Sequence, residues 1–188
     1  FIHLKMKKLF FLCFAMTSSF IQSQNIDIVN TKKDIGTDYW RIVNDDVMGG
    51  VSKSNVTLDP SNFFIFFRGN VSMDNNGGFA SCRHAFNDPK LEKTKLFKIR
   101  LKGDGKIYQF RVGTSETYAS YCYDFQTIKD KWIEVDILTE KLIPKIRGRY
   151  VPNAPSFDPK YVREIGILIA EKQEGKFALL LESIKAIK

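Results

Sequence analysis

In the stretch Lys95-Leu96-Phe97-Lys98-Ile99-Arg100-Leu101-Lys102, apolar and basic residues alternate from Phe97 onward. This period of two is typical of a β-strand with one buried face, because successive side chains of a strand point to opposite sides. The turn Gly103-Asp104-Gly105 follows, and a second alternating run begins at Ile107 and ends at Val112. Two such runs around a glycine-rich turn predict a β-hairpin.

Working outward from this pair, the rest of the chain also reads as short strands. Two runs, 63–67 and 165–169, are apolar on both faces and predict central strands that are covered on each side. The best helical candidate is a single turn near Asp158-Pro159. About ten strands between turns rich in Gly, Asn and Asp predict one all-β domain, a sandwich or a barrel. The further expected strands are 79–83, 118–125, 132–137 and 176–184.

The N-terminus resembles a secretory signal peptide. Met6-Lys7-Lys8 precedes a short apolar run, and Ser23 is a plausible cleavage point. We therefore predict a leader over residues 1–23, of which 1–5 lie upstream of the start at Met6, and a mature domain over 24–188. The protein would be exported, to the periplasm or outside the cell. The apolar run is too short to span a bilayer, so no membrane span is expected in the mature chain.

Composition limits the chemistry. The 188 residues are 44% hydrophobic and 27% charged, which is typical of a globular domain that buries a core. Only two His and three Cys are present, and the mature chain keeps a single histidine, His84. No nucleophile elbow, phosphate loop or dinucleotide fingerprint is found. We predict no catalytic residue, no metal and no cofactor; whether Cys82 and Cys122 form a disulfide stays open.

The net charge of +8 falls to +5 when the leader leaves, because residues 1–23 hold three lysines and no acid. Much of the excess lies between Lys90 and Arg111. There Lys98, Arg100 and Lys102 form a row on one strand face, which is either a solvated outer face or a patch for an acidic partner. Nucleic acid is not expected as a partner, since no aromatic residue interrupts that row to stack on bases.

Several ordered motifs resemble one known family. They are Trp40-Arg41-Ile42-Val43-Asn44-Asp45-Asp46-Val47-Met48-Gly49-Gly50-Val51-Ser52, Asn75-Asn76-Gly77-Gly78-Phe79-Ala80-Ser81-Cys82-Arg83, Lys102-Gly103-Asp104-Gly105-Lys106-Ile107-Tyr108, Pro144-Lys145-Ile146-Arg147-Gly148 and Ile165-Gly166-Ile167-Leu168-Ile169. Together they are similar to the signature of the CIA30 family, named for complex I intermediate-associated protein 30. The resemblance runs from about Trp40 to Ile187.

The resemblance implies a galactose-binding-like jelly roll, a sandwich of two antiparallel sheets. It also implies a non-catalytic module that holds a protein partner, here in the cell envelope because of the predicted leader. The alternative is a carbohydrate-binding module of the same fold group. Candidate binding residues are those of the matching motifs: Asn44, Asp45, Met48, Gly49, Gly50, Asn76, Gly77, Gly78, Arg83 and Arg147.

The same residues have structural interpretations that the sequence leaves open. The segment 44–50 is either a pocket lip or a demanding turn before a strand. Asp74 and Asn75, with Asp45 or Asp104, could offer oxygen ligands to calcium, but the same segment is a sound turn. Tyr121, Tyr123 and Phe125 share one strand face, with Tyr118 on the other, and form either a sugar-stacking platform or part of the core.

Overall fold

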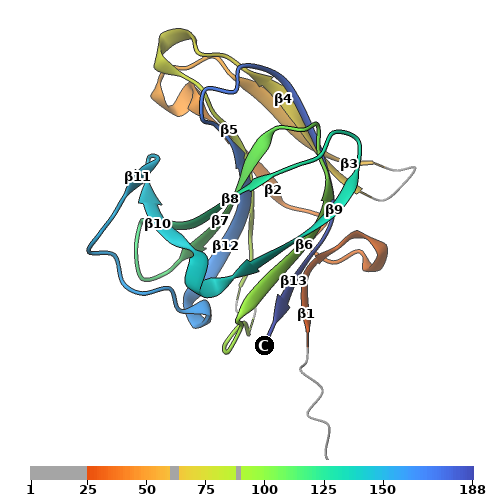
Figure 1. Ribbon diagram of the computed structural model, residues 1–188, viewed down its shortest axis with the longest axis vertical. Coiled ribbons are helices and arrows are strands. Elements are labelled where there is room, and N and C mark those ends of the chain that lie inside the picture. The colour runs from red at the N-terminus through yellow and green to blue at the C-terminus, as the bar shows by residue number, and fades with distance from the viewer. Residues whose placement is uncertain (1–24, 60–63, 88–89) are drawn as a thin grey trace, which may run out of the picture.

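The structure, a computed structural model, describes residues 25–59, 64–87 and 90–188. The predicted leader lies outside the described residues. The chain forms two antiparallel sheets that pack face to face (Figure 1), so the prediction of an all-β sandwich is confirmed. The helical segments that the structure describes are short 3-10 turns, and none is long and apolar enough to cross a membrane.

The six-stranded sheet runs in the order β3-β4-β13-β6-β9, and β1 pairs with the C-terminal part of β13. Its strands are β1 (Ile26–Asn30), β3 (Lys53–Asp59), β4 (Phe64–Val71), β6 (Leu96–Lys102), β9 (Trp132–Leu138) and β13 (Gly175–Ile187).

The seven-stranded sheet runs in the order β11-β10-β8-β7-β12-β5-β2. Its strands are β2 (Trp40–Asn44), β5 (Ala80–Ala85), β7 (Ile107–Thr114), β8 (Ser120–Gln126), β10 (Ile143–Ile146), β11 (Arg149–Tyr150) and β12 (Val162–Ile169). The 3-10 turns are η1 (Thr31–Lys33), η2 (Asp45–Met48), η3 (Asp74–Asn76), η4 (Thr139–Lys141) and η5 (Pro159–Tyr161).

The core lies between the sheets and follows the alternation of the strands. Phe97, Ile99 and Leu101 of β6 are fully buried, as the alternation predicts. Across the core, Phe97 meets Phe110 of β7 with ring centroids 5.4 Å apart. Burying large apolar side chains on the facing sides of two sheets is the main stabilising contribution in such a sandwich.

The predicted β-hairpin of 95–112 is wrong. β6 pairs with β13 and β9, whereas β7 pairs with β12 and β8, so the two strands belong to opposite sheets. The Gly103-Asp104-Gly105 segment is a crossover between sheets. The side chain of Asp104 holds it in place by accepting hydrogen bonds from the backbone nitrogen of Ala178 in β13 (3.0 Å) and from the Tyr108 hydroxyl (3.1 Å). Alternation reports one buried face for each strand but not which strand lies beside it.

The two runs that are apolar on both faces differ in outcome. In β12, residues 165–169 are all buried, because the outward Leu168 is covered as well as the core-facing isoleucines. In β4 only one side is buried: Ile65 and Phe67 face the core, while Phe64 and Phe66 are half-buried on the outer face. Phe64 packs there on Trp132, with ring centroids 4.7 Å apart. The prediction of full cover is therefore confirmed for 165–169 and wrong for 64–67, while residue 63 of the predicted run lies outside the described residues.

Candidate functional site

The first two family-like motifs meet at one buried carboxylate. Asp45, 1% exposed, follows β2 and accepts hydrogen bonds from the backbone nitrogens of Ser52 (2.9 Å), Gly78 (2.7 Å) and Phe79 (3.2 Å), and from the Ser52 hydroxyl. Its own backbone nitrogen donates to the Phe79 carbonyl. Segments 44–52 and 77–79 are therefore joined through this side chain, which we call the Asp45 hub.

Two glycines make room for the hub. A Cβ atom at Gly50 would overlap the carboxyl group of Asp45, and one at Gly77 would come within 2.6 Å of its Oδ2 atom. Gly49, by contrast, has open space around it and is required for its backbone, whose φ of 90° lies in the left-handed region. Gly50 and Gly77 thus allow the backbone to lie against the Asp45 carboxyl group, and Gly49 allows the chain to reverse direction.

The electrostatics of the hub favour the ionised form of the Asp45 carboxyl group. Burial would raise the pKa of the Asp45 carboxyl, but the hydrogen bonds from Ser52, Gly78 and Phe79 outweigh burial and lower that pKa. All of these donors belong to the protein itself, so the hub favours the structural interpretation of the 44–50 segment over that of an open pocket lip.

The hub has an exposed apolar side. Val47, Met48 and Val51 are 67%, 57% and 45% exposed, and they flank the two glycines of the turn. We call these three side chains the apolar tip; they belong to η2 and the residues directly after it, a segment drawn in orange at the upper left of Figure 1. Asn44 supports its base, because its Oδ1 atom accepts a hydrogen bond from the Ser54 hydroxyl (2.6 Å).

The candidate residues Asn44, Asp45, Met48, Gly49, Gly50, Asn76, Gly77 and Gly78 lie in this one region, on η2, η3 and the segments beside them. Arg83 and Arg147 do not. Arg147 lies in the β10–β11 turn at the opposite edge of the seven-stranded sheet, where its φ of 48° and that of Gly148 at 76° reverse the chain. The Pro144–Gly148 motif therefore builds a hairpin turn away from the hub.

Arg83 points to the outer face of the seven-stranded sheet, away from the core. There Glu164 of β12 pairs with Arg83 (3.2 Å) and with Arg41 of β2 (2.5 Å). Arg111 of β7 lies on the same face and donates to the Ser120 hydroxyl (3.0 Å). Burial, together with the charge of Arg83, lowers the pKa of Arg111. Sequence reasoning missed Arg41, Arg111 and Glu164, although their outward positions in alternating strands were a usable signal.

The basic row of β6 is largely compensated by acids. Lys98 pairs with Asp136 (2.8 Å) and Glu134 (3.7 Å), and Arg100 pairs with Glu134 (3.8 Å) and Glu182. Lys102 lies over the Trp132 ring, 6.0 Å from its centroid. Because β9 places acidic residues directly opposite the basic ones in the strand register, the structure favours a solvated, ion-paired outer face over an open cationic patch.

The calcium interpretation finds little support. Asp45 is surrounded by hydrogen-bond donors, and both carboxylate oxygens of Asp104 accept protein hydrogen bonds. Among residues 25–59, 64–87 and 90–188, no group of three or more His, Cys, Asp or Glu side chains is placed to hold a metal ion.

The aromatic residues of β8 belong to the core. Tyr121 and Phe125 are buried and Tyr123 packs against them from a half-buried position, while Tyr118 lies in the preceding loop, fully exposed. Exposed tyrosines in the described part of the chain are Tyr39, Tyr118 and Tyr150, which lie in three separate segments. The aromatic residues of β8 therefore do not form the exposed face that a sugar-stacking platform needs.

Cys82 and Cys122 are free and buried. Cys82 faces the core, whereas Cys122 lies in β8 beside Arg111 on the outer face. Strands β12 and β7 separate them within the sheet. A disulfide between these two residues would need the sheet to come apart, because bridged Cα atoms lie only about 4.4–6.8 Å apart.

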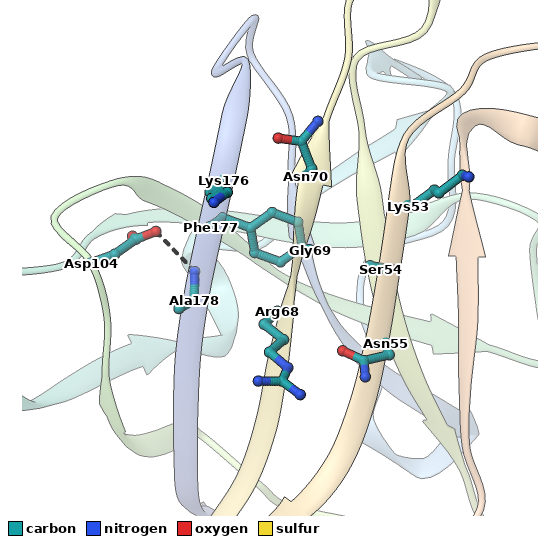
Figure 2. Close-up of a pocket in the computed structure, with 10 residues that line it drawn as sticks. All are labelled: Lys53, Ser54, Asn55, Arg68, Gly69, Asn70, Asp104, Lys176, Phe177 and Ala178. Carbon is teal, nitrogen blue, oxygen red and sulfur yellow. Dashed lines mark hydrogen bonds between the residues drawn. The ribbon is translucent and has the colours of Figure 1, made fainter.

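A shallow hollow of about 670 Å³ lies on the outer face of the six-stranded sheet, over β3, β4 and β13 (Figure 2). The Phe177 ring lies beside Gly69, where a Cβ atom would come within 2.8 Å of it. Lys53, Arg68 and Lys176 line the hollow without an ion pair to any described residue. Figure 2 shows these three side chains pointing in different directions, so they do not converge on one ligand position.

Comparisons with known proteins agree with this architecture. The model of the Complex I intermediate-associated protein 30 (CIA30) family matches residues 28–181. A protein of Schizosaccharomyces pombe, described as "Uncharacterized protein C9E9.15", is 31% identical over 169 residues, covering 79% of this chain and 77% of its own.

Among solved structures, the family 11 carbohydrate-binding module of the cellulosomal cellulase Lic26A-Cel5E of Clostridium thermocellum is similar, with a TM-score of 0.66 and 12% identity over 88% of this chain and 95% of its own. The Clostridium thermocellum family 11 module in complex with a β-1,3-1,4-mixed-linked tetrasaccharide gives a TM-score of 0.63 at 12% identity, covering 87% of this chain and 95% of its own. At such identities the likeness shows the jelly-roll fold alone.

Proposed function

Because the chain belongs to the Complex I intermediate-associated protein 30 (CIA30) family, we propose that it is a non-catalytic binding module that holds a protein partner through the apolar tip. The observation that carries this proposal is the contrast at residues 44–52. A buried carboxylate and two sterically required glycines hold the turn rigidly, yet its outward side chains are apolar and uncovered. Exposed apolar groups of this kind mark interaction sites when they gather in one place.

The chemistry of the tip defines the partner surface. Val47, Met48 and Val51 offer three apolar side chains of different shape, and methionine adapts well to irregular apolar surfaces. Asp46 is exposed beside them and adds one negative charge. The surface that fits is therefore an apolar groove on a protein, with a cationic residue at its rim. A rigid turn costs little entropy to place in such a groove.

The cell envelope is proposed as the place of action, since the sequence over Met6–Ser23 resembles an export signal. A role as a carbohydrate-binding module through the aromatic residues of β8 receives less support, because those residues are packed in or against the core.

The test is to capture the protein partner and then to measure its affinity for this protein. A photo-crosslinking residue at position 47 would be used to label the partner in native envelope extract; the labelled protein would then be identified, purified and titrated. We expect Met48→Asp to weaken its binding at least ~10-fold, as loss of a buried apolar contact does. The matched control is Ile143→Asp, a similarly exposed apolar residue on β10 of the seven-stranded sheet. Equal affinities for Met48→Asp and the unchanged protein would rule out the tip as the contact.

A further inference from the structure

Two arginines on the outer face of the seven-stranded sheet flank one glycine. Arg83 of β5 and Arg111 of β7 are both aligned with Gly166 of the intervening β12. Aligned residues of neighbouring antiparallel strands point to the same face, so the two side chains rise on either side of a position that has none. A Cβ atom at Gly166 would come within 3.2 Å of Arg83 Cγ. We call Arg83 and Arg111 the arginine pair.

The charge around the arginine pair is not balanced. Glu164 is the carboxylate in contact, and it already pairs with both Arg41 and Arg83. Among the described residues, Arg111 donates a hydrogen bond to a neutral partner, the Ser120 hydroxyl at 3.0 Å, and the Glu164 charge acts on it without an ion-pair contact. Two like charges on either side of β12 repel each other, and a compensating anion would remove that repulsion.

The pair also lacks hydrogen-bond acceptors. Three buried side-chain polar atoms of the described residues have no partner, and two of them are Nε of Arg83 and Nε of Arg111. Buried N–H groups without an acceptor are unfavourable and uncommon, and a bound water or ion is one of the ways in which they are satisfied. The two arginines on either side of β12 therefore share one unmet requirement, an oxygen acceptor, and their like charges favour an anionic one.

We propose that the arginine pair binds the carboxylate of an acidic saccharide, a sugar chain that contains uronic acid. A guanidinium group matches a carboxylate through two parallel N–H···O bonds, and a pair of them can enclose one. This ligand would be a second one, bound independently of the protein partner at the apolar tip.

The surroundings of the pair favour a saccharide over an acidic peptide. Towards β8 the face continues with Gln109, Ser120 and Asp124, which carry amide, hydroxyl and carboxylate groups suited to sugar hydroxyls. Among the described residues that face outward on β2, β5, β12, β7 and β8, the exposed large hydrophobic side chain is Ile107, at the first position of β7 and two outward positions away from Arg111. A single such side chain at the end of a strand is not an apolar centre. A protein interface normally needs such an apolar centre, whereas a hydroxylated chain does not.

The experiment is a titration of the protein with trigalacturonate, followed by the side-chain Nε–H resonances of arginine in nuclear magnetic resonance spectra and by calorimetry. We expect the Arg83 and Arg111 resonances to shift and Arg111→Gln to weaken binding at least tenfold, with Arg111→Lys in between. The matched control is Arg68→Gln, which removes the same charge from the opposite sheet and should change the affinity less than twofold.

Three results would overturn the proposal: no binding of trigalacturonate, an equal loss in Arg68→Gln, or equal binding of neutral galactotriose. A fourth arm uses tetraglutamate, and binding as strong as that of trigalacturonate would show an acidic-peptide site instead. None of these outcomes depends on Met48→Asp, so this site and the apolar tip are tested separately. Melting curves of Arg111→Gln and Arg111→Lys that match the unchanged protein show that the fold is retained.

Discussion

The carboxylate Oδ2 atom of Asp45 lies 2.7 Å from the backbone nitrogen of Gly78, thirty-three residues further along the chain. This single bond joins the turn after β2 to the segment that leads into β5, its neighbour in the seven-stranded sheet. Because the Ser52 hydroxyl also accepts a hydrogen bond from the backbone nitrogen of Ser72 (2.9 Å), the hub reaches the start of β3 and the end of β4, which lie side by side. The fold at this corner of the sandwich depends on one ionised side chain.

Replacing Asp45 by Asn should therefore destabilise the protein. An amide keeps one acceptor oxygen but directs an NH₂ group at backbone N–H donors, which leaves buried polar groups unpaired. We expect the free energy of unfolding to fall by about 2–4 kcal/mol, measured by urea denaturation. Asp46→Asn is the control, because Asp46 is exposed and its carboxylate accepts only from the backbone nitrogen of Val47. Equal effects of both variants would contradict the role given to the hub.

The two adjacent glycines of the turn should respond differently to alanine. At Gly50 the new methyl group would overlap the Asp45 carboxyl group, so we expect Gly50→Ala to cost several kcal/mol, comparable with Asp45→Asn. At Gly49 nothing lies within reach, and the cost is the left-handed backbone alone, about 1–2 kcal/mol. Thermal melting of the two variants measures the difference. A larger loss in Gly49→Ala would show that backbone strain, and not the close approach to Asp45, governs this turn.

Much of the fold could be predicted from local alternation. In β6 and β9 the apolar positions identified the buried face, since a period of two survives folding unchanged. The alternation could not predict which strands pair with one another in the sheets. β6 and β7 are separated by a glycine-rich turn that is consistent with a hairpin, and their assignment to opposite sheets depends on Asp104 bonding to β13, seventy-four residues away.

For the candidate site, too, the sequence showed some features and only the structure showed the others. The motif glycines and Asp45 were visible in the sequence, but only the structure shows that they surround one another and leave Val47, Met48 and Val51 outside. Lys98 and Arg100 looked like a free basic row because their acidic partners come from β9 and β13, far along the chain. Arg111 belongs to none of the binding motifs. It became a candidate because the register of β5, β12 and β7 aligns it with Arg83 on either side of Gly166.

Acid should weaken the fold through groups whose pKa values are lowered by folding. For Glu182, burial alone would raise the pKa, but hydrogen bonds from Lys32 and Arg100 lower it, and the pKa values of Asp27 and Asp45 are also lowered. Such groups stabilise the protein fully above their unfolded pKa values of about 4 and lose that contribution as the pH falls through the lower folded values. Urea denaturation between pH 2 and 7 should show this fall. Asp45→Asn should show a shallower one, and an unchanged slope would contradict the assignment.

His84 should add a separate pH dependence near neutrality. Burial between Trp40 and Phe86 lowers its pKa below 6.5, although the Asp38 carbonyl, 3.0 Å from Nδ1, opposes that effect. The unfolded chain then takes up a proton more readily than the folded one, so stability is complete above about pH 6.5 and declines as the pH falls towards the lower folded value. His84→Gln should remove this decline in unfolding curves measured from pH 5 to 8. A decline that persists in the variant would assign it to other groups.

The two cysteines should be inert until the protein unfolds. Burial raises the pKa of the Cys82 thiol to about 12 and that of Cys122 to about 11. Against an ordinary value of about 8.5, the reactive thiolate at pH 8 is reduced on the order of 100-fold or more, and burial also blocks access. Alkylation with iodoacetamide, mapped to individual peptides by mass spectrometry so that Cys13 is counted apart, should therefore be slow without urea and fast in it.

Because Cys82 faces the core and Cys122 the outer face, oxidised preparations should yield no peptide that links them. A linked peptide from folded protein would mean that the register of β5, β12, β7 and β8 is not the one described here.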